Sequence, residues 1–337
     1  MILDRCPSTL KSGYDSYSPS ALKKLFNGKK VSHILPFLSP EKDEHTRELF
    51  MDNRERLSIS GVQNKISLVL QKNKLRLNKF QEDGQYILKP IPSDVKKTDQ
   101  VPANEHLTMQ LAEQIFNIYT AANGLIFFQD GQPAYITKRF DIKLDGTKYL
   151  IDDFTSLTKK SAIRSGPDFK YEGSVELLFQ TLKKFVGAYK IESVKLFRIV
   201  LFNYVFSNGD AHLKNYSLMQ TDDGDYILSP AYDLFCTRLH VDDSDIAFTN
   251  GLFEADYETE SYKANGYFAY DDFFELGIKT GLSESIIKHE IQLFSASEKE
   301  IESLVGRSFL NNDMKAGYLE LYRDKLKRLR YSFLGMV

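Results

Sequence analysis

The sequence predicts an α+β fold with two lobes, a mostly β N-terminal lobe with one main helix and a larger, mostly helical C-terminal lobe. Three observations predict this fold. The chain has 337 residues, about twice the size of a typical single domain. Short β-branched or alternating segments, separated by polar turns, occur between residues 65 and 140. Beyond residue 142, long apolar stripes recur at helical spacing. We therefore expect lobes at residues 1–140 and 141–337, joined near residues 139–143.

The N-terminal lobe is expected to begin with a short helix over residues 21–26, capped by the Ser-Pro-Ser triplet before it. Polar turns separate the apolar segments that follow, which is typical of an antiparallel meander or hairpin series. Apolar residues recur at three-to-four spacing over residues 104–116 and predict an amphipathic helix. The expected strands are residues 65–70, 75–78, 86–88, 124–128 and 134–140.

The C-terminal lobe is expected to consist mainly of long helices. Basic side chains in the last apolar stripe alternate with leucines at helical spacing, which favours a solvated helix face over a nucleic-acid patch. A β-hairpin is expected across an Asp-Asp-Gly turn, with strands at residues 216–219 and 226–228. The expected helices are residues 175–186, 192–206, 283–294 and 316–331.

The composition excludes several classes of protein. Lysine and arginine number 44 against 46 aspartate and glutamate, so the net charge of −2 gives no reason to propose direct nucleic-acid or anionic-membrane binding. Two cysteines rule out a disulfide framework, and the histidines show no paired spacing for zinc. The sequence has no run of about 18 apolar residues and no secretion signal. We expect a cytoplasmic protein without a membrane span.

The segment SNGDAHLKNY at residues 207–216 carries the strongest chemical signal. Four residues separate Asp210 from Asn215, which is the spacing of a protein-kinase catalytic loop. In such a loop the aspartate accepts the proton of an attacking hydroxyl, and the asparagine offers its amide oxygen to a magnesium ion. The expected hairpin then returns Asp233 beside the loop, where a kinase has its metal-binding aspartate. A surface loop or a helix cap is the alternative for an Asp and an Asn at this spacing.

Two further segments of the N-terminal lobe fit phosphoryl transfer. Lys89 ends a predicted strand, and Glu105 follows in the first turn of the predicted helix, as in the lysine–glutamate ion pair of kinases. The alternative is a solvated strand end and an acid that stabilises a helix N-terminus. Residues 58–65 (SISGVQNK) form a Ser/Gly turn whose backbone amides can line an anion. Because this turn has a single glycine, a plain turn is the alternative there.

Six motifs together resemble the HipA-type serine/threonine kinases, the toxins of bacterial toxin–antitoxin systems. In chain order they are SISGVQNKISLVL, YILKP, NEHLTMQLAEQIF, KRFD, SNGDAHLKN and SPAYDL, and they lie between residues 55 and 240. The chain is most similar to the shorter HipT branch, and this resemblance implies that it is without the extra N-terminal subdomain of longer HipA proteins. The resemblance implies a bilobal, protein-kinase-like (HipA-type) fold that binds ATP and Mg²⁺ between its lobes.

The resemblance also implies roles for individual residues. Asp210 would be the catalytic base, and Asn215 and Asp233 would hold Mg²⁺. Ser58 and Ser60 would be autophosphorylation sites, where added negative charge beside the ATP phosphates should suppress activity. The remaining residues would bind ATP. Lys89, paired with Glu105, and His212 would lie at the phosphates, where Ser60 and Gly61 of the Ser/Gly turn would also contact ATP. Lys138 and Phe140 would contact the adenine, Asp141 would contact the ribose, and Asn215 and Asp233 would act through the metal.

The chain departs from eukaryotic kinases at two motifs. Asp233-Leu234-Phe235 replaces the DFG triplet, and Asn208 replaces the histidine of the HRD motif; both replacements are normal in HipA-like kinases. The implied function is a toxin-type protein kinase whose targets in the resembling family are aminoacyl-tRNA synthetases. The implied partners are a small HipS-like antitoxin and a DNA-binding HipB-like antitoxin. A kinase-like small-molecule phosphotransferase and an inactive pseudokinase that serves as a binding module are the alternatives.

Overall fold

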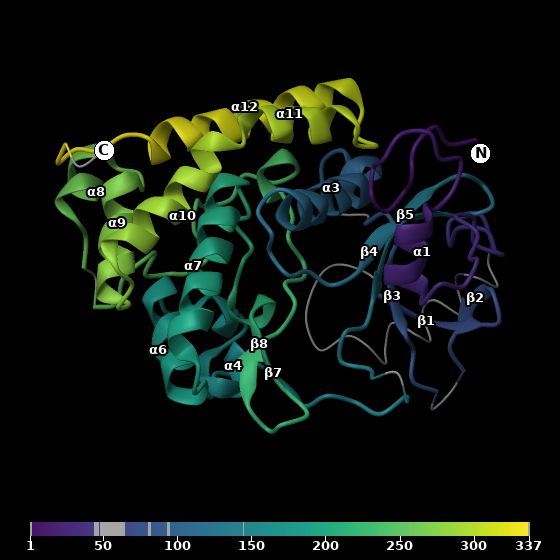
Figure 1. Ribbon diagram of the computed structural model, residues 1–337, viewed down its shortest axis with the longest axis horizontal. Coiled ribbons are helices and arrows are strands. Elements are labelled where there is room, and N and C mark those ends of the chain that lie inside the picture. Colours follow the sequence, from purple (N-terminus) through teal and green to yellow (C-terminus); the bar gives the residue numbers. More distant parts are fainter. Residues whose placement is uncertain are drawn as a thin grey trace.

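The computed structural model describes residues 2–43, 47, 65–79, 82–92, 95–143, 145–255 and 257–335. It is a mixed α/β fold in which an antiparallel sheet occupies one end of the molecule and most of the helices occupy the other (Figure 1). The N-terminus lies beside the sheet, and the C-terminus lies at the helical end (Figure 1). Within the described residues, no helix combines the length and the apolar character needed to cross a membrane.

The N-terminal sheet has five strands in the order β2-β1-β3-β5-β4, and every neighbouring pair is antiparallel. Side chains alternate between its faces. Ala134 and Ile136 pack into a core with α1 (Pro19–Phe26), whereas Tyr135 between them faces the core formed with α3 (Val101–Gln114). All five predicted strands are confirmed, although β5 ends two residues early. The strands are β1 (Ile66–Gln71), β2 (Lys74–Leu77), β3 (Tyr86–Lys89), β4 (Asn123–Phe127) and β5 (Pro133–Lys138).

The predicted helix α1 is present but begins two residues earlier, at Pro19. The Ser18 hydroxyl caps it by accepting a hydrogen bond of 3.3 Å from the backbone N–H of Ala21. Helix α3 begins earlier than predicted, with Pro102 in its first turn, a position that suits proline. The prediction that α3 is amphipathic is wrong, since every residue from Val101 to Ala112 is buried. The helix lies between the sheet and the helical part, where its polar side chains bond to other elements; Thr108, for example, bonds to Tyr318.

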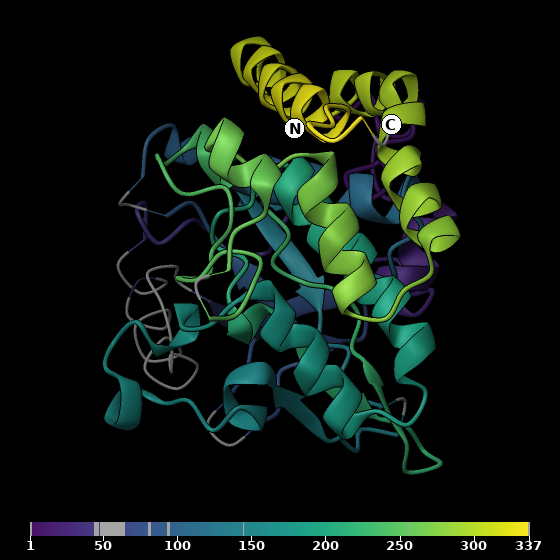
Figure 2. The same cartoon turned by 90° about the vertical axis from the view of Figure 1, so that its left-hand side faces the viewer.

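The helical part contains the four predicted long helices and a second, three-stranded sheet in the order β6-β7-β8. The predicted hairpin is confirmed as β7 and β8, whereas β6, α9 and α11 were not predicted. Helices α11 and α12 lie along one edge of the molecule in both views (Figures 1 and 2). The elements are β6 (Ile151–Asp153), α4 (Phe154–Leu157), α5 (Ala162–Ser165), α6 (Val175–Phe185), α7 (Tyr189–Val205), β7 (Ser217–Gln220), β8 (Tyr226–Leu228), α8 (Glu260–Asn265), α9 (Tyr270–Lys279), α10 (Glu284–Ala296), α11 (Glu298–Gly306) and α12 (Asn312–Leu329).

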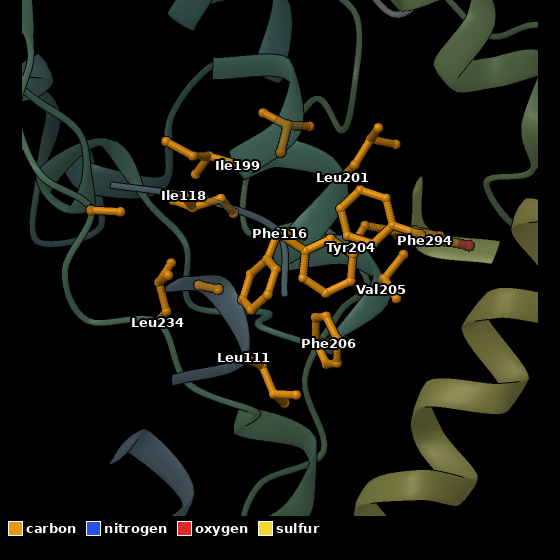
Figure 3. Packing of buried hydrophobic residues seen from close by; sticks show 14 of the residues in the cluster. Leu111, Phe116, Ile118, Ile199, Leu201, Tyr204, Val205, Phe206, Leu234 and Phe294 are labelled. Atoms are coloured by element: carbon orange, nitrogen blue, oxygen red, sulfur yellow. The ribbon is translucent and has the colours of Figure 1, made fainter. Parts of the chain in front are cut away.

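A large aromatic core fixes α7 against the surrounding elements. Phe116, just after α3, stacks on Phe294 of α10 with ring centroids 4.3 Å apart, and it meets Phe206 edge-on at 5.7 Å (Figure 3). Such pairs add to the stabilisation from area burial. Because Phe206 directly follows α7, this packing fixes the point at which the chain leaves the helix and enters the segment that the sequence marks as catalytic.

Candidate active site

A pocket of about 330 Å³ lies where the N-terminal sheet and α3 meet the helical part. Residues from both parts of the chain line it. Six of the residues predicted for the site are among them: Lys89, Glu105, Asp210, His212, Asn215 and Asp233. The fold therefore brings together side chains that are far apart in the sequence; Lys89 and Asp233, for example, are separated by 144 positions.

A buried lysine joins two carboxylates at the base of this pocket. Lys89 is the last residue of β3 and pairs with Tyr135 across the sheet, so it shares the face that is turned toward α3. Its Nζ lies 2.5 Å from Glu105 Oε1 and 2.6 Å from Asp233 Oδ1. Lys65 lies 3.2 Å from the other oxygen of Asp233. The predicted Lys89–Glu105 ion pair is thus present, and Asp233 extends it.

Lys89 and Asp233 hold each other in the ionised state, whereas Glu105 does not share this effect. Burial would raise the pKa of Asp233, but Lys65 and Lys89 outweigh burial and bring that pKa well below its usual range. Burial would lower the pKa of Lys89, yet its two carboxylate neighbours raise it. The pKa of Glu105 is raised, because burial there exceeds the effect of Lys89. Asp233 also has a left-handed backbone with φ of 55°, a strained conformation of the kind found at functional sites.

The loop after α7 is held by packing and by backbone hydrogen bonds. The N–H of Gly209 donates to the Thr237 hydroxyl at 2.8 Å, and that hydroxyl donates to the carbonyl of Ser207 at 2.9 Å. A Cβ at Gly209 would overlap Asp243 and the backbone carbonyl of Ser244, so the glycine permits this close approach. The loop therefore presents the next residue, Asp210, from a fixed backbone.

Of the predicted site residues that the structure describes, Asp210 is the most open, with 52% of its side chain exposed. Its Oδ1 accepts a hydrogen bond of 2.6 Å from the hydroxyl of Tyr171 and lies 4.0 Å from His212 Nε2. Burial lowers the pKa of His212 to about 4, so this imidazole is neutral near pH 7. Asp210 is thus an accessible carboxylate at the mouth of the pocket, with a neutral histidine behind it.

Asn215 combines a structural contact with a position in the pocket. Its amide oxygen accepts a hydrogen bond of 3.1 Å from the N–H of His212 and so closes the short 3-10 helix Leu213–Asn215. The helix-cap alternative is therefore realised at this residue. Its side chain nevertheless lines the same pocket as Asp210 and Asp233, because this turn carries it round.

Three predicted nucleotide contacts lie apart from these groups. Lys138, Phe140 and Asp141 are not among the described residues that line the pocket. Lys138 Nζ donates to Asn27 beyond α1, and Phe140 packs on Tyr232 with ring centroids 5.6 Å apart. The Asp141 carboxylate is paired with the neighbouring Arg139. Their contacts to adenine and ribose remain predictions.

The predicted loop residues Ser58, Ser60 and Gly61 lie outside the described residues. Two contacts in the pocket were not predicted at all. Lys65, the last residue of the SISGVQNK segment, pairs with Asp233. Tyr171 bonds to Asp210 from a segment with no periodic pattern, so no signal in the sequence indicated it.

The pocket therefore combines the ion-paired Lys65 and Lys89 with an accessible carboxylate. It also has an amide and a second carboxylate suited to a hard divalent cation. Two solved structures share the surrounding fold. Shewanella oneidensis HipA, in its complex with HipB and operator DNA, matches with a TM-score of 0.62 at 21% identity, over 81% of this chain and 65% of that chain. The Helicobacter pylori proinflammatory kinase CtkA matches with a TM-score of 0.51 at 14% identity, over 79% of this chain and 91% of that chain. The fold is thus HipA-like and kinase-like, and the chain spans slightly less than two thirds of the HipA chain.

Sequence comparison assigns the family. The model of the HipA-like C-terminal domain matches residues 57–299, so the chain belongs to this family. A Haemophilus influenzae protein named "Putative kinase" is 24% identical over 349 residues, covering 96% of this chain and 95% of that protein. "Putative kinase Y4dM" of Sinorhizobium fredii is 28% identical over 312 residues, covering 86% of this chain and 71% of that protein. Membership in the family is confirmed, while membership in the HipT branch remains a prediction.

Proposed function

We propose that this protein is an ATP-dependent serine/threonine protein kinase. One observation carries the proposal: buried Lys89 joins Glu105 to Asp233 in the pocket that Asp210 and Asn215 also line. A lysine that is fixed by a helix glutamate and a metal-binding aspartate is the arrangement that kinases need to position ATP phosphates. The kinase names of the sequence relatives and the kinase-like fold support the same conclusion.

In this proposal Asp210 acts as the catalytic base. The acceptor hydroxyl donates its proton to Asp210 while its oxygen attacks the γ-phosphorus of ATP. The bond from that phosphorus to the bridging oxygen breaks, and ADP leaves with the electron pair. Lys89 binds the phosphates, and Glu105 holds its ammonium group in place. His212, neutral near pH 7, adds no charge beside the base.

The residues of the pocket fit a magnesium ion. Asn215 supplies an amide oxygen and Asp233 a carboxylate, and Mg²⁺ is usually held by one or two carboxylates together with substrate phosphates and water. The low pKa of Asp233 keeps that carboxylate ionised, and its two oxygens are paired with Lys65 and Lys89. When bound, Mg²⁺ would neutralise charge on the phosphate oxygens.

The finer assignments rest on the family resemblance. We propose residues 1–140 and 141–337 as the two lobes, with adenine bound at the backbone of Lys138 and Phe140 and ribose at Asp141. Ser60 and Gly61 would cover the phosphates, and autophosphorylation of Ser58 or Ser60 would lower activity by charge repulsion. These roles are all testable by substitution.

The proposed biological role is that of a HipT-like toxin whose target is a protein, with an aminoacyl-tRNA synthetase as the candidate. The solved Shewanella complex contains HipA with HipB and operator DNA, which supports a HipB-like antitoxin as a partner here. A small HipS-like antitoxin is proposed on the resemblance alone.

Intact-mass spectrometry after incubation with ATP and Mg²⁺ tests the function. We expect the full chain to gain phosphate in steps of one phosphoryl group, and we expect Asp210→Asn to gain none while it still binds ATP. Asp222→Asn is the matched control, since Asp222 is a largely exposed aspartate in the turn between β7 and β8.

The same experiment separates the two alternatives. A strict small-molecule phosphotransferase would hydrolyse or transfer phosphate without adding it to itself. A pseudokinase would bind ATP and transfer phosphate to nothing. Full phosphate incorporation by Asp210→Asn would show that the base is assigned wrongly.

A further inference from the structure

Tyr171 is held at the mouth of the pocket by the catalytic loop. Its hydroxyl donates to Asp210 Oδ1 at 2.6 Å, and its ring meets the His212 ring edge-on at 5.3 Å. In the same 3-10 helix (Phe169–Tyr171), Phe169 lies under Lys214 of the loop, with Nζ 5.1 Å from the ring centroid. Three separate contacts thus join this surface turn to the loop that carries Asp210.

The backbone of Tyr171 is anchored, whereas its side chain is only partly buried. The carbonyl of Tyr171 accepts a hydrogen bond of 3.0 Å from the N–H of Thr249, and that of Gly173 accepts one of 3.0 Å from Asn250. Release of the hydroxyl therefore requires rotation of the side chain and no movement of the main chain. Rotations of this kind are fast compared with enzyme turnover.

The hydrogen bond coincides with the geometry expected for an acceptor. A general base must lie about 2.6–3.2 Å from the hydroxyl whose proton it takes. The Tyr171 hydroxyl meets this condition with respect to Asp210, at 2.6 Å. Burial raises the pKa of Tyr171, and the hydrogen bond to Asp210 raises it further, so the phenol remains a donor at neutral pH.

We propose that the Tyr171 hydroxyl occupies the position on Asp210 that the acceptor hydroxyl takes during the reaction, as an internal place-holder. A substrate hydroxyl must displace Tyr171 from this position before phosphate is transferred. The inference rests on the proposed role of Asp210 as the base. While Tyr171 holds the carboxylate, water is not activated there, and ATP is spared from hydrolysis. A protein substrate removes the block by presenting its own hydroxyl and moving the tyrosine ring aside.

ATP hydrolysis without an added protein substrate tests this role, because water is then the competing acceptor. Release of inorganic phosphate, which counts transfer to water and not self-phosphorylation, is measured on the full chain at saturating ATP and Mg²⁺. Tyr171→Phe keeps the ring and removes the hydroxyl. We expect phosphate release to rise about 3- to 10-fold, the range that follows from losing one hydrogen bond of ordinary net strength, because partial exposure to water weakens the bond to the carboxylate. Tyr119→Phe is the matched control, since 70% of Tyr119 is exposed and it lies outside the pocket.

Further variants make the result unambiguous. Tyr171→Leu, which also removes the ring, should show the same rise, and adding Asp210→Asn to either variant should abolish it. An unchanged or slower rate in Tyr171→Phe, with Asp210→Asn inactive, overturns the place-holder role and leaves the proposed function standing. Phosphate found on Tyr171 itself also overturns it, because the hydroxyl would then be an acceptor. A rate that Asp210→Asn leaves unchanged refutes the assignment of the base.

Discussion

Replacing Lys89 with methionine should separate the structural and catalytic roles of the buried network. Lys89→Met keeps the length of the side chain and removes the ammonium group that lies 2.5 Å from Glu105 and 2.6 Å from Asp233. Glu105 is only 3% exposed, so it would be left as a buried carboxylate without that partner. Asp233 would keep Lys65 at 3.2 Å.

The expected loss in the free energy of unfolding is about 3 kcal/mol, the low end of the range for breaking a buried ion pair. The low end applies because the pKa of Glu105 is already raised, so protonation relieves part of the cost. Adding Glu105→Leu replaces the pair with apolar side chains, which is often neutral or stabilising. The double variant should therefore regain at least about 2 kcal/mol. It should not regain ATP binding.

Urea unfolding at equilibrium measures the stability, and calorimetric titration with ATP and Mg²⁺ measures binding. Lys65→Met is the control, because its ion pair with Asp233 is partly exposed and should be worth less than about 1 kcal/mol. A loss below about 1 kcal/mol in Lys89→Met, or no recovery in the double variant, would refute the reasoning about the buried pair.

Two further predictions concern the catalytic loop and the core. Gly209→Ala should abolish self-phosphorylation and lower the free energy of unfolding by about 1–3 kcal/mol, because the new Cβ overlaps Asp243 and the Ser244 carbonyl. Intact-mass spectrometry measures the phosphorylation, and thermal unfolding measures the stability. Gly187→Ala is the control, since Gly187 has open space around it and the substitution should change neither quantity. If Gly209→Ala is fully active, the close approach does not matter. Burial lowers the pKa of His106 to about 4, so between pH 6.5 and 4 the unfolded chain binds a proton that the native state does not. As the pH falls over that range, the free energy of unfolding should decrease by up to about 3 kcal/mol because of this residue. Urea unfolding of His106→Gln should show a smaller decrease in the free energy of unfolding with falling pH. An identical pH dependence in the two proteins would contradict this prediction.

Local patterns predicted all five strands of the N-terminal sheet and the four long helices. The strands around Lys89 follow from apolar segments between polar turns, and the catalytic loop follows from the spacing of Asp210 and Asn215. Helix α3 was misread, because a helix enclosed by both parts of the chain has no polar face toward solvent. Its polar residues are satisfied by distant partners, as Asn104 is by the carbonyl of Cys236.

The contacts that complete the site depend on tertiary structure. Lys65 pairs with a residue 168 positions away, and Tyr171 reaches Asp210 from a short turn without periodicity. No local sequence pattern indicates either contact. The Lys65 contact depends on how the start of β1 meets the helical part, and the Tyr171 contact depends on how the turn before α6 lies against the catalytic loop. The Lys89–Glu105 pair was predictable from motifs, whereas the pairing of Asp233 with both lysines was not.

The most direct test of the central claim is a crystal structure of the full chain with a non-hydrolysable ATP analogue and Mn²⁺ in place of Mg²⁺. Our account predicts an anomalous peak about 2 Å from both the amide oxygen of Asn215 and a carboxylate oxygen of Asp233. It also predicts that Lys89 contacts the phosphates and that Asp210 faces the γ-phosphoryl group. Metal and triphosphate bound away from these four side chains would contradict it.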